Sequence, residues 1–253
     1  MKKSFFLVVI VGLVFMLSSC HQKTQIIAHR GYWQSAGSAE NSIHSLQAAD
    51  NIGVYGSEFD VHLTADNVLL VFHDNTVQGM NLQKVNYSQL AGVRLKNGEP
   101  IPTLEKYLEV ATKLKVHLIF ELKAHQTPER NREAARLSWA MVKRYNLQER
   151  TSFISFDLDA VKEFIHLSPK SKVYYLKGDL SPQQLKGMGF AGLDYSREVM
   201  AHHPDWFKEA QRNGMEINVW TVDDLGEARR LMKKGADFIT TNKPESMQEL
   251  LNK

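Results

Sequence analysis

Short apolar runs alternate with amphipathic stretches along this chain, and that alternation restricts its possible folds more than any other feature. Repeated alternation of strand and helix patterns predicts a mostly parallel sheet covered by helices, which means a doubly wound sheet or a (β/α)8 barrel. The strand-like runs cover residues 25–29, 55–63, 68–73, 116–122, 151–156, 172–176, 190–195, 216–221 and 237–241. The helix-like stretches cover residues 41–52, 103–113, 128–146, 157–167, 181–187, 204–213, 223–234 and 244–252.

Nine strand-like runs are one more than a barrel needs. The runs 55–63 and 68–73 are joined by only four residues, which is too short for a parallel crossover. They therefore predict a β-hairpin after the second strand, which would bring His73 beside Asp60. The other eight runs account for a barrel, and a doubly wound sheet would need a glycine-rich phosphate loop that is absent after the first strand. We expect an α/β protein with one (β/α)8 barrel domain over residues 26–253.

The first twenty residues have the pattern of an export signal. Lys2 and Lys3 precede an apolar run over 5–17, which is shorter than the ~18 residues of a membrane-spanning helix. The following Leu17-Ser18-Ser19-Cys20 resembles the bacterial lipobox, in which the cysteine after the cleavage site is lipidated. We expect a signal peptide over 1–19, a lipidated Cys20 and a short tether over 20–25. The alternative is an ordinary signal peptide with an incidental cysteine.

The charge of the mature chain excludes some partners. Without Lys2 and Lys3, 29 basic and 28 acidic residues remain, so nothing suggests nucleic-acid binding. Cys20 is the single cysteine, so no internal disulfide can form. We expect an exported protein that is lipid-anchored to a bacterial membrane, faces the periplasm and has no protein partner.

Polar residues follow the apolar runs at four places. In a (β/α)8 barrel the carboxyl ends of the strands meet at one mouth, where active sites lie. This arrangement predicts an active site built from several strand ends. The four segments are His29-Arg30-Gly31, Glu58-Phe59-Asp60, His73-Asp74 and Glu121-Leu122-Lys123.

Residue types and spacing suggest the chemistry but leave alternatives open. Glu58 and Asp60 are two apart on a strand, so both project from one face and suit Mg²⁺ or Ca²⁺. Alternatively, one faces solvent and the other caps a turn. Glu121 and Lys123 repeat this spacing, as a ligand and a phosphate-binding cation or as a structural ion pair.

Two histidines at strand ends can act as an acid and a base near neutral pH. His29 and His73 fit this description, although a histidine after an apolar strand is more often structural. His62 is a rival because it shares a strand face with Glu58 and Asp60; we expect it to lie behind the site or to face outward.

The ordered set of motifs resembles the glycerophosphodiester phosphodiesterase family over about residues 26–245. The resemblance rests on His29-Arg30-Gly31, Glu40-Asn41-Ser42, Glu58-Phe59-Asp60-Val61, Thr64-Ala65-Asp66, Val71-Phe72-His73-Asp74, Pro102-Thr103-Leu104-Glu105, Glu121-Leu122-Lys123, Ser155-Phe156, Val219-Trp220-Thr221-Val222 and residues 235–244.

This resemblance implies a TIM-type barrel that hydrolyses a phosphodiester with one divalent cation, Ca²⁺ or Mg²⁺. The implied roles are metal ligand for Glu58, Asp60 and Glu121, acid or base for His29 and His73, phosphoryl binding for Arg30 and Lys123, and lining of the alcohol pocket for Trp220. The chain departs from the family where Asn242 replaces the usual aspartate, at a position that we expect to be structural. It departs also at residues 77–80, where the usual Arg and Thr pattern is absent.

The implied reaction is hydrolysis of glycerophosphodiesters to sn-glycerol 3-phosphate and an alcohol. The nucleophile is either water or the 2-hydroxyl of the substrate. Two alternatives remain: a phospholipase C- or D-like enzyme that acts on intact lipid, and a non-catalytic ligand-binding lipoprotein.

Overall fold

The computed structural model describes residues 23–251. The predicted signal peptide and Cys20 lie outside the described residues. None of the helices within 23–251 is long and apolar enough to cross a membrane.

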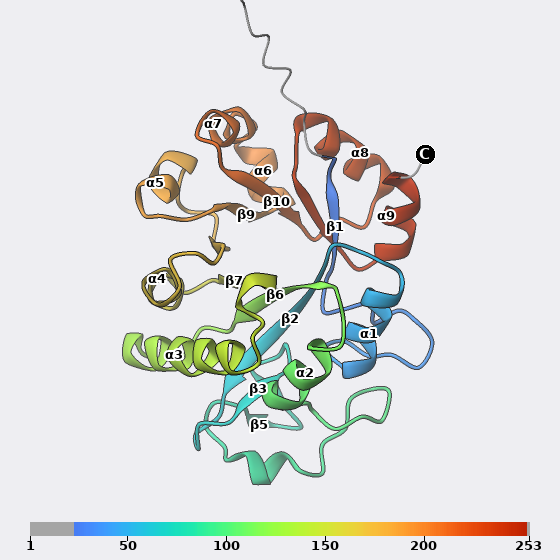
Figure 1. The fold of residues 1–253 in the computed structure, drawn as a ribbon, viewed down its shortest axis with the longest axis vertical. Helices are drawn as coiled ribbons and strands as arrows, with labels where there is room; N and C mark the ends of the chain where they lie inside the picture. The colour runs from blue at the N-terminus through green and yellow to red at the C-terminus, as the bar shows by residue number, and fades with distance from the viewer. Residues whose placement is uncertain (1–22, 252–253) are drawn as a thin grey trace, which may run out of the picture.

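Eight parallel strands form a closed barrel, which confirms the predicted fold (Figure 1). They are β1 (Gln25–Ala28), β2 (Gly56–Leu63), β6 (His117–Leu122), β7 (Thr151–Ser155), β8 (Val173–Tyr175), β9 (Gly192–Ser196), β10 (Glu216–Trp220) and β11 (Phe238–Thr241). The neighbours run β1-β11-β10-β9-β8-β7-β6-β2, and β1 pairs with β2 to close the ring. Closure brings the carboxyl ends of all eight strands to one mouth.

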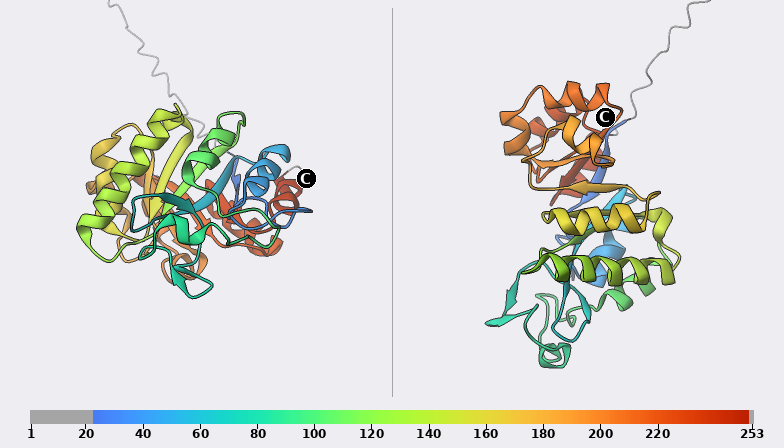
Figure 2. Two further views of the ribbon diagram at one scale, coloured as in Figure 1. Left: turned by 90° about the horizontal axis from the view of Figure 1, so that it is seen from below. Right: turned by 90° about the vertical axis from the view of Figure 1, so that its left-hand side faces the viewer.

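The predicted hairpin is present. β3 (Leu69–Val71) pairs antiparallel with β2, with Val71 opposite Val61. The amide of Phe72 donates to the carbonyl of Asp60 over 2.9 Å, so the chain enters the mouth beside Asp60. The irregular segment after the hairpin includes β4 (Thr76–Val77), β5 (Met80–Asn81) and the 3₁₀ helix η1 (Tyr87–Leu90), and it packs around a small core of its own. Figure 2 shows this segment projecting from one side of the helix ring.

Nine helices surround the barrel within the described residues. They are α1 (Ile43–Asn51), α2 (Leu104–Ala111), α3 (Pro128–Arg144), α4 (Leu158–Leu167), α5 (Pro182–Gly187), α6 (Arg197–His202), α7 (Trp206–Arg212), α8 (Leu225–Lys234) and α9 (Pro244–Leu251), and a 3₁₀ turn, η2 (Gln148–Arg150), precedes β7. Asp157 and Ser181 cap α4 and α5 through their side chains, and Gly235 ends α8 in the left-handed conformation, as their sequence positions indicate. The sequence pattern did not predict α6.

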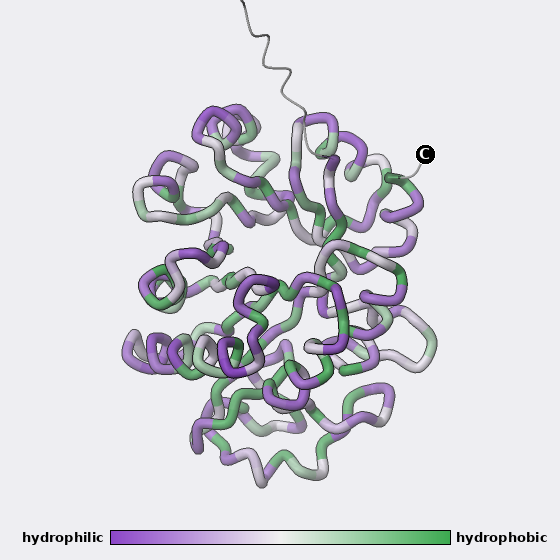
Figure 3. The backbone as a smooth tube through the Cα atoms, in the orientation of Figure 1, coloured by the Kyte–Doolittle hydropathy of each residue, from purple (hydrophilic) through white to green (hydrophobic). Residues whose placement is uncertain are grey.

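Alternation along β2 divides its side chains between two environments. Phe59 and Val61 join the core between barrel and helices, where Phe59 packs on Phe120 with ring centroids 5.1 Å apart. Glu58 and Asp60 project from the opposite face into the barrel. Hydropathy also alternates along helices such as α3 (Figure 3), in which Ala134, Ala135 and Val142 are buried. The helices thus cover the outer, apolar face of the sheet, whereas the barrel interior holds the polar residues of the mouth together with a small apolar cluster that includes Ile27, Ile119 and Phe238.

Candidate active site

The structure brings the predicted site residues together in one pocket of about 160 Å³ at the carboxyl ends of the strands. This position is the mouth that the barrel prediction requires. The pocket lining includes the predicted His29, Arg30, Glu58, His73, Glu121, Lys123 and Trp220. Asp60 lies beside the pocket as part of a carboxylate cluster.

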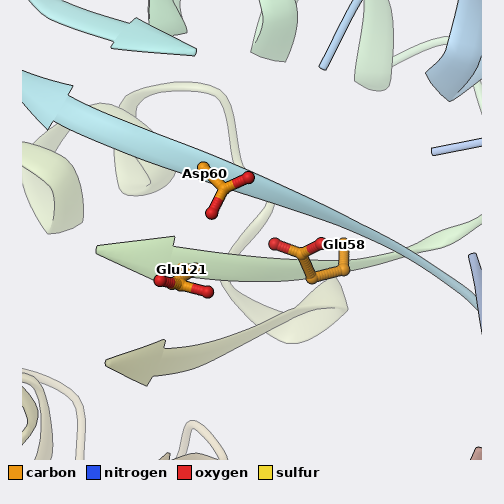
Figure 4. Close-up of side chains that lie close together, drawn as sticks. All are labelled: Glu58, Asp60 and Glu121. Carbon is orange, nitrogen blue, oxygen red and sulfur yellow. The ribbon is translucent and has the colours of Figure 1, made fainter. Parts of the chain in front are cut away.

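The carboxylate cluster consists of Glu58, Asp60 and Glu121. Each offers an oxygen within 4.8 Å of the other two, and their carboxyl groups point toward one another (Figure 4). Strand register produces this arrangement, because Asp60 lies opposite Glu121 in the parallel pairing of β2 with β6. All three are buried, with relative exposures of 2%, 1% and 9%.

Three buried carboxylates repel one another, and two of them resist ionisation. Burial, reinforced by Asp60 and Glu121, raises the pKa of Glu58 well above its usual range. Burial and Asp60 raise the pKa of Glu121 to about 7. Oε1 of Glu58 is buried without a hydrogen-bond partner. A hard divalent cation would supply the missing partner and the opposite charge, so the donor set fits Mg²⁺ or Ca²⁺.

Asp60 is held ionised by its neighbours. Burial alone would raise the pKa of this carboxyl, but Lys123, His73 and Asn41 offset the burial and lower it. The side chain of Asn41 donates to Oδ2 of Asp60 over 2.8 Å and accepts from the amide of Asp60 over 3.0 Å. Nζ of Lys123 lies 3.2 Å from Asp60 and 2.7 Å from Glu121. From the sequence alone, Asn41 is known only as part of a motif and has no assigned role. The structure shows that its side chain makes two hydrogen bonds with Asp60.

Arg30 lies on a tight turn that directs both its backbone and its side chain into the site. Its amide donates to Glu58 over 2.8 Å, and its guanidinium pairs with Glu40 at 2.8 Å. Its φ of 56° and the φ of 75° at Gly31 are left-handed. A Cβ at Gly31 would lie 2.4 Å from Oγ of Ser45, so only glycine fits this position.

His29 is positioned by a residue that we expected to be structural. Nδ1 of His29 lies 2.8 Å from Oδ1 of Asn242. The backbone amide and the side-chain amide of Asn242 both donate to Asp223, over 2.8 and 2.9 Å. A carboxylate only accepts, so the amide group of Asn242 faces Asp223 and its oxygen faces His29. Asn242 thus holds a predicted catalytic histidine in place, a contact that its position in the sequence did not reveal.

This contact also determines which nitrogen of His29 carries the proton. Because Oδ1 of Asn242 accepts a hydrogen bond, Nδ1 donates it and Nε2 of the neutral ring keeps the lone pair. Nε2 lies 3.9 Å from Glu58. Burial, together with the charge on Arg30, lowers the pKa of His29 and favours the neutral ring.

His73 has a different environment. Its Nδ1 lies 2.7 Å from the carboxylate of Asp74, and this contact fixes the orientation of the ring. The rival His62 is fully buried and contacts the carbonyl of His73 through Nε2 at 3.3 Å. His62 therefore lies behind the site, one of the two positions that we expected.

The side of the pocket away from the carboxylates is more apolar. Trp220 packs against Phe156 with ring centroids 5.7 Å apart, and Phe156 is 40% exposed. Nε1 of Trp220 donates to the carbonyl of Asp194 over 3.0 Å. The carboxyl group of Asp194 also lines the pocket, and burial raises its pKa to about 7. Neither Phe156 nor Asp194 is among the site residues predicted from the sequence.

Comparisons with known proteins agree with this site. A glycerophosphodiester phosphodiesterase from Caldanaerobacter subterraneus is 28% identical over 91% of this chain and 99% of its own. A crystal structure of a glycerophosphodiester phosphodiesterase from Parabacteroides distasonis is 58% identical, covering 91% of this chain and 98% of that one, with a TM-score of 0.90. A phosphodiesterase from Oleispira antarctica in complex with the product sn-glycerol-3-phosphate is 25% identical, covering 90% and 97%, with a TM-score of 0.77.

The model of the Glycerophosphoryl diester phosphodiesterase family matches residues 29–246, which include the carboxylate cluster and both histidines. The match begins at His29, directly after β1, and includes the carboxyl ends of the other seven barrel strands. The chain therefore belongs to the glycerophosphoryl diester phosphodiesterase family and is a glycerophosphodiester phosphodiesterase.

Proposed function

We propose that the enzyme hydrolyses glycerophosphodiesters to sn-glycerol 3-phosphate and an alcohol with one divalent cation, and that His29 and His73 are its base and acid. The observation that carries this proposal is the cluster of Glu58, Asp60 and Glu121 in the same pocket as both histidines. The product complex of the Oleispira relative supports sn-glycerol 3-phosphate as the shared product.

The three buried carboxylates are the proposed ligands of Ca²⁺ or Mg²⁺. When bound there, the cation would offset negative charge on the phosphoryl oxygens. Arg30 and Lys123 would contribute further positive charge beside the same pocket. Lys123 contacts two of the ligands, so its role as a phosphoryl contact requires its ammonium group to turn toward the substrate.

The two histidines are suited to opposite roles. Nε2 of His29 carries a lone pair in the neutral ring and can take a proton from the nucleophile, which is either water or the 2-hydroxyl of the substrate. The contact of Nδ1 of His73 with the carboxylate of Asp74 leaves Nε2 of His73 to give a proton to the leaving alkoxide. Trp220 and Phe156 would pack against the carbon skeleton of the substrate.

The proposed location is a bacterial membrane, on the side that faces the periplasm, with an acyl anchor on Cys20. β1 begins at Gln25 on the amino-terminal face of the barrel, whereas His29 follows the same strand at the mouth. An anchor at Cys20 therefore joins the barrel on the face opposite the active site. This arrangement favours soluble diesters as substrates over intact lipids of the same membrane, and so favours the diesterase over the phospholipase alternative.

The test is turnover of glycerophosphocholine, followed by release of sn-glycerol 3-phosphate. We expect His29→Ala and His73→Ala each to lower kcat by about 10²–10⁴, and His166→Ala, on the exposed side of α4, to leave it unchanged. EDTA should abolish turnover, and added Ca²⁺ or Mg²⁺ should restore it. Near-normal turnover in either histidine variant would contradict the acid–base assignment, and indifference to EDTA would contradict the metal. Binding of the diester without turnover in the wild type would favour a ligand-binding lipoprotein.

A further inference from the structure

Charge is distributed unevenly between the two ends of the barrel. We define the base face as the last three residues of each α-helix except α6, which leads into α7 rather than into a strand, the loop from each of these helices to the next barrel strand, and the first residue of that strand, together with the start of the described chain. Because all eight barrel strands are parallel, these segments gather at the end opposite the active site.

The base face is strongly basic among the described residues. It carries twelve basic residues, namely Lys23, Lys113, Lys115, Lys143, Arg144, Arg150, Lys170, Lys172, Lys186, Arg212, Lys233 and Lys234. It carries six acidic residues, namely Asp50, Glu109, Glu149, Glu216, Asp237 and Glu249. The remainder of the mature chain has 17 basic and 22 acidic residues. The mature protein is therefore nearly neutral as a whole, but its base face has a net positive charge and the remainder has a net negative charge.

These positive charges face solvent. Of the twelve, only Arg150 is partly covered, and the other eleven are exposed. Within residues 23–251, two of the twelve form ion pairs: Arg144 with Glu105 and Lys172 with Glu216. Several of the acids, in contrast, are engaged in the fold. Asp50 accepts from the amides of Lys115 and Val116, for example.

Helix stabilisation explains only half of this pattern. Lysine and arginine near a helix C-terminus interact favourably with the helix dipole, and six of the twelve lie in the last turns of α3, α5, α7 and α8. The other six precede a strand rather than lying in the last turn of an α-helix, and they gain much less from a helix dipole. They are Lys23, Lys113, Lys115, Arg150, Lys170 and Lys172.

The chain also enters the barrel at this face. Cys20 is three residues from Lys23, and three residues span at most about 10 Å. An acyl group on Cys20 would thus hold the base face close to the bilayer surface. Electrostatic attraction extends over a similar length, about 8 Å at physiological ionic strength.

From these observations we propose that the base face docks on the surface of an anionic phospholipid bilayer and directs the active site away from it. The proposal rests on the proposed Cys20 anchor for proximity and on the basic residues for orientation. Basic residues close to an anionic leaflet add to the affinity of a lipid anchor, which alone holds a protein less firmly.

Lysine acetylation on vesicles tests the orientation directly. The lipidated full-length product would be reconstituted on phosphatidylcholine vesicles with or without phosphatidylglycerol, treated with an amine-acetylating reagent and mapped by mass spectrometry. On anionic vesicles we expect several-fold less labelling at Lys113, Lys115 and Lys170, and unchanged labelling at the exposed Lys84 and Lys96. High salt should remove the protection. Equal labelling of both sets, or protection of Lys84 and Lys96 instead, would overturn the proposal.

Charge removal provides a matched comparison. The triple change Lys113→Gln, Lys115→Gln and Lys170→Gln should abolish the protection of Lys143, Lys186 and Lys233. The control triple Lys84→Gln, Lys96→Gln and Lys162→Gln removes three exposed lysines elsewhere and should retain it. Retained protection in the first variant would contradict the proposal.

The outcome is separable from the proposed function. Labelling does not depend on turnover, and both triple variants should keep wild-type turnover of glycerophosphocholine, which also reports their folding. The mass of the N-terminal peptide reports the acyl group. If that group is absent, anionic vesicles at low salt should still protect Lys113, Lys115 and Lys170 from acetylation. Full labelling of these lysines would refute docking.

Discussion

Asp194 provides the sharpest test of the electrostatics of the barrel interior. This residue is 2% exposed, and its carboxyl group accepts a hydrogen bond from the side chain of Asn218 over 2.8 Å. Burial raises its pKa from the ordinary 3.8 to about 7, and nearby Glu121 adds to the effect. The folded protein therefore binds a proton here that the unfolded chain releases at lower pH. We expect Asp194→Asn, which resembles the neutral acid, to stabilise the protein at high pH.

The size of the effect follows from the two pKa values. A tenfold change in proton affinity is worth about 1.4 kcal/mol, so the interval from 3.8 to about 7 corresponds to at most about 4 kcal/mol. The raised pKa costs little stability below the ordinary pKa of 3.8, where Asp194 is mostly protonated in both states. The cost grows as the pH rises toward 7 and is complete above it. Asp194→Asn should thus match the wild type near pH 4 and exceed it by up to about 4 kcal/mol at pH 8.

The measurement is urea denaturation of both proteins from pH 4 to pH 8 in EDTA, with the difference in free energy of unfolding plotted against pH. Asp205→Asn, which changes an exposed carboxyl at the start of α7, is the control and should not stabilise the protein at pH 8. A flat difference for Asp194→Asn, or destabilisation at pH 8, would refute the reasoning.

Three further predictions concern single contacts. Asn242→Leu removes the acceptor for Nδ1 of His29, so kcat should fall roughly ten- to hundredfold, whereas Asn242→Asp keeps an acceptor and should retain more activity; equal kcat values would contradict a positioning role. Gly31→Ala places a Cβ 2.4 Å from Oγ of Ser45 and should lower the free energy of unfolding by about 2 kcal/mol or more, while Gly53→Ala, with a similar φ but open space, should cost about 1 kcal/mol in the same denaturation assay. Phe156→Ala should raise KM for glycerophosphocholine several-fold with little change in kcat, and a fall in kcat alone would exclude a binding role for this ring.

Local sequence patterns accounted for most of the fold because they depend on short-range geometry. The four residues between the second and third strand-like runs permit a hairpin and no crossover, and that restriction is enough to predict that His73 lies beside Asp60. The period of two along β2 likewise predicts that Glu58 and Asp60 share one face. The short helix α6 was missed because its six residues follow β9 directly and carry too little periodicity to stand out.

The family motifs indicated the roles of the site residues. The contacts that these residues make with distant parts of the chain depend on closure of the barrel. The amino-acid sequence alone determined the alternation of strands and helices, the hairpin and the facing carboxylates of β2, because each follows from spacing along the chain. Only the tertiary structure showed that Asn242 holds His29 across 213 residues, that Asn41 clamps Asp60 and that Asp194 reaches the pocket. These contacts join strand ends and loops from distant parts of the chain. Their partners are therefore set by register and by the pairing of β1 with β2 and β11, which no local pattern encodes.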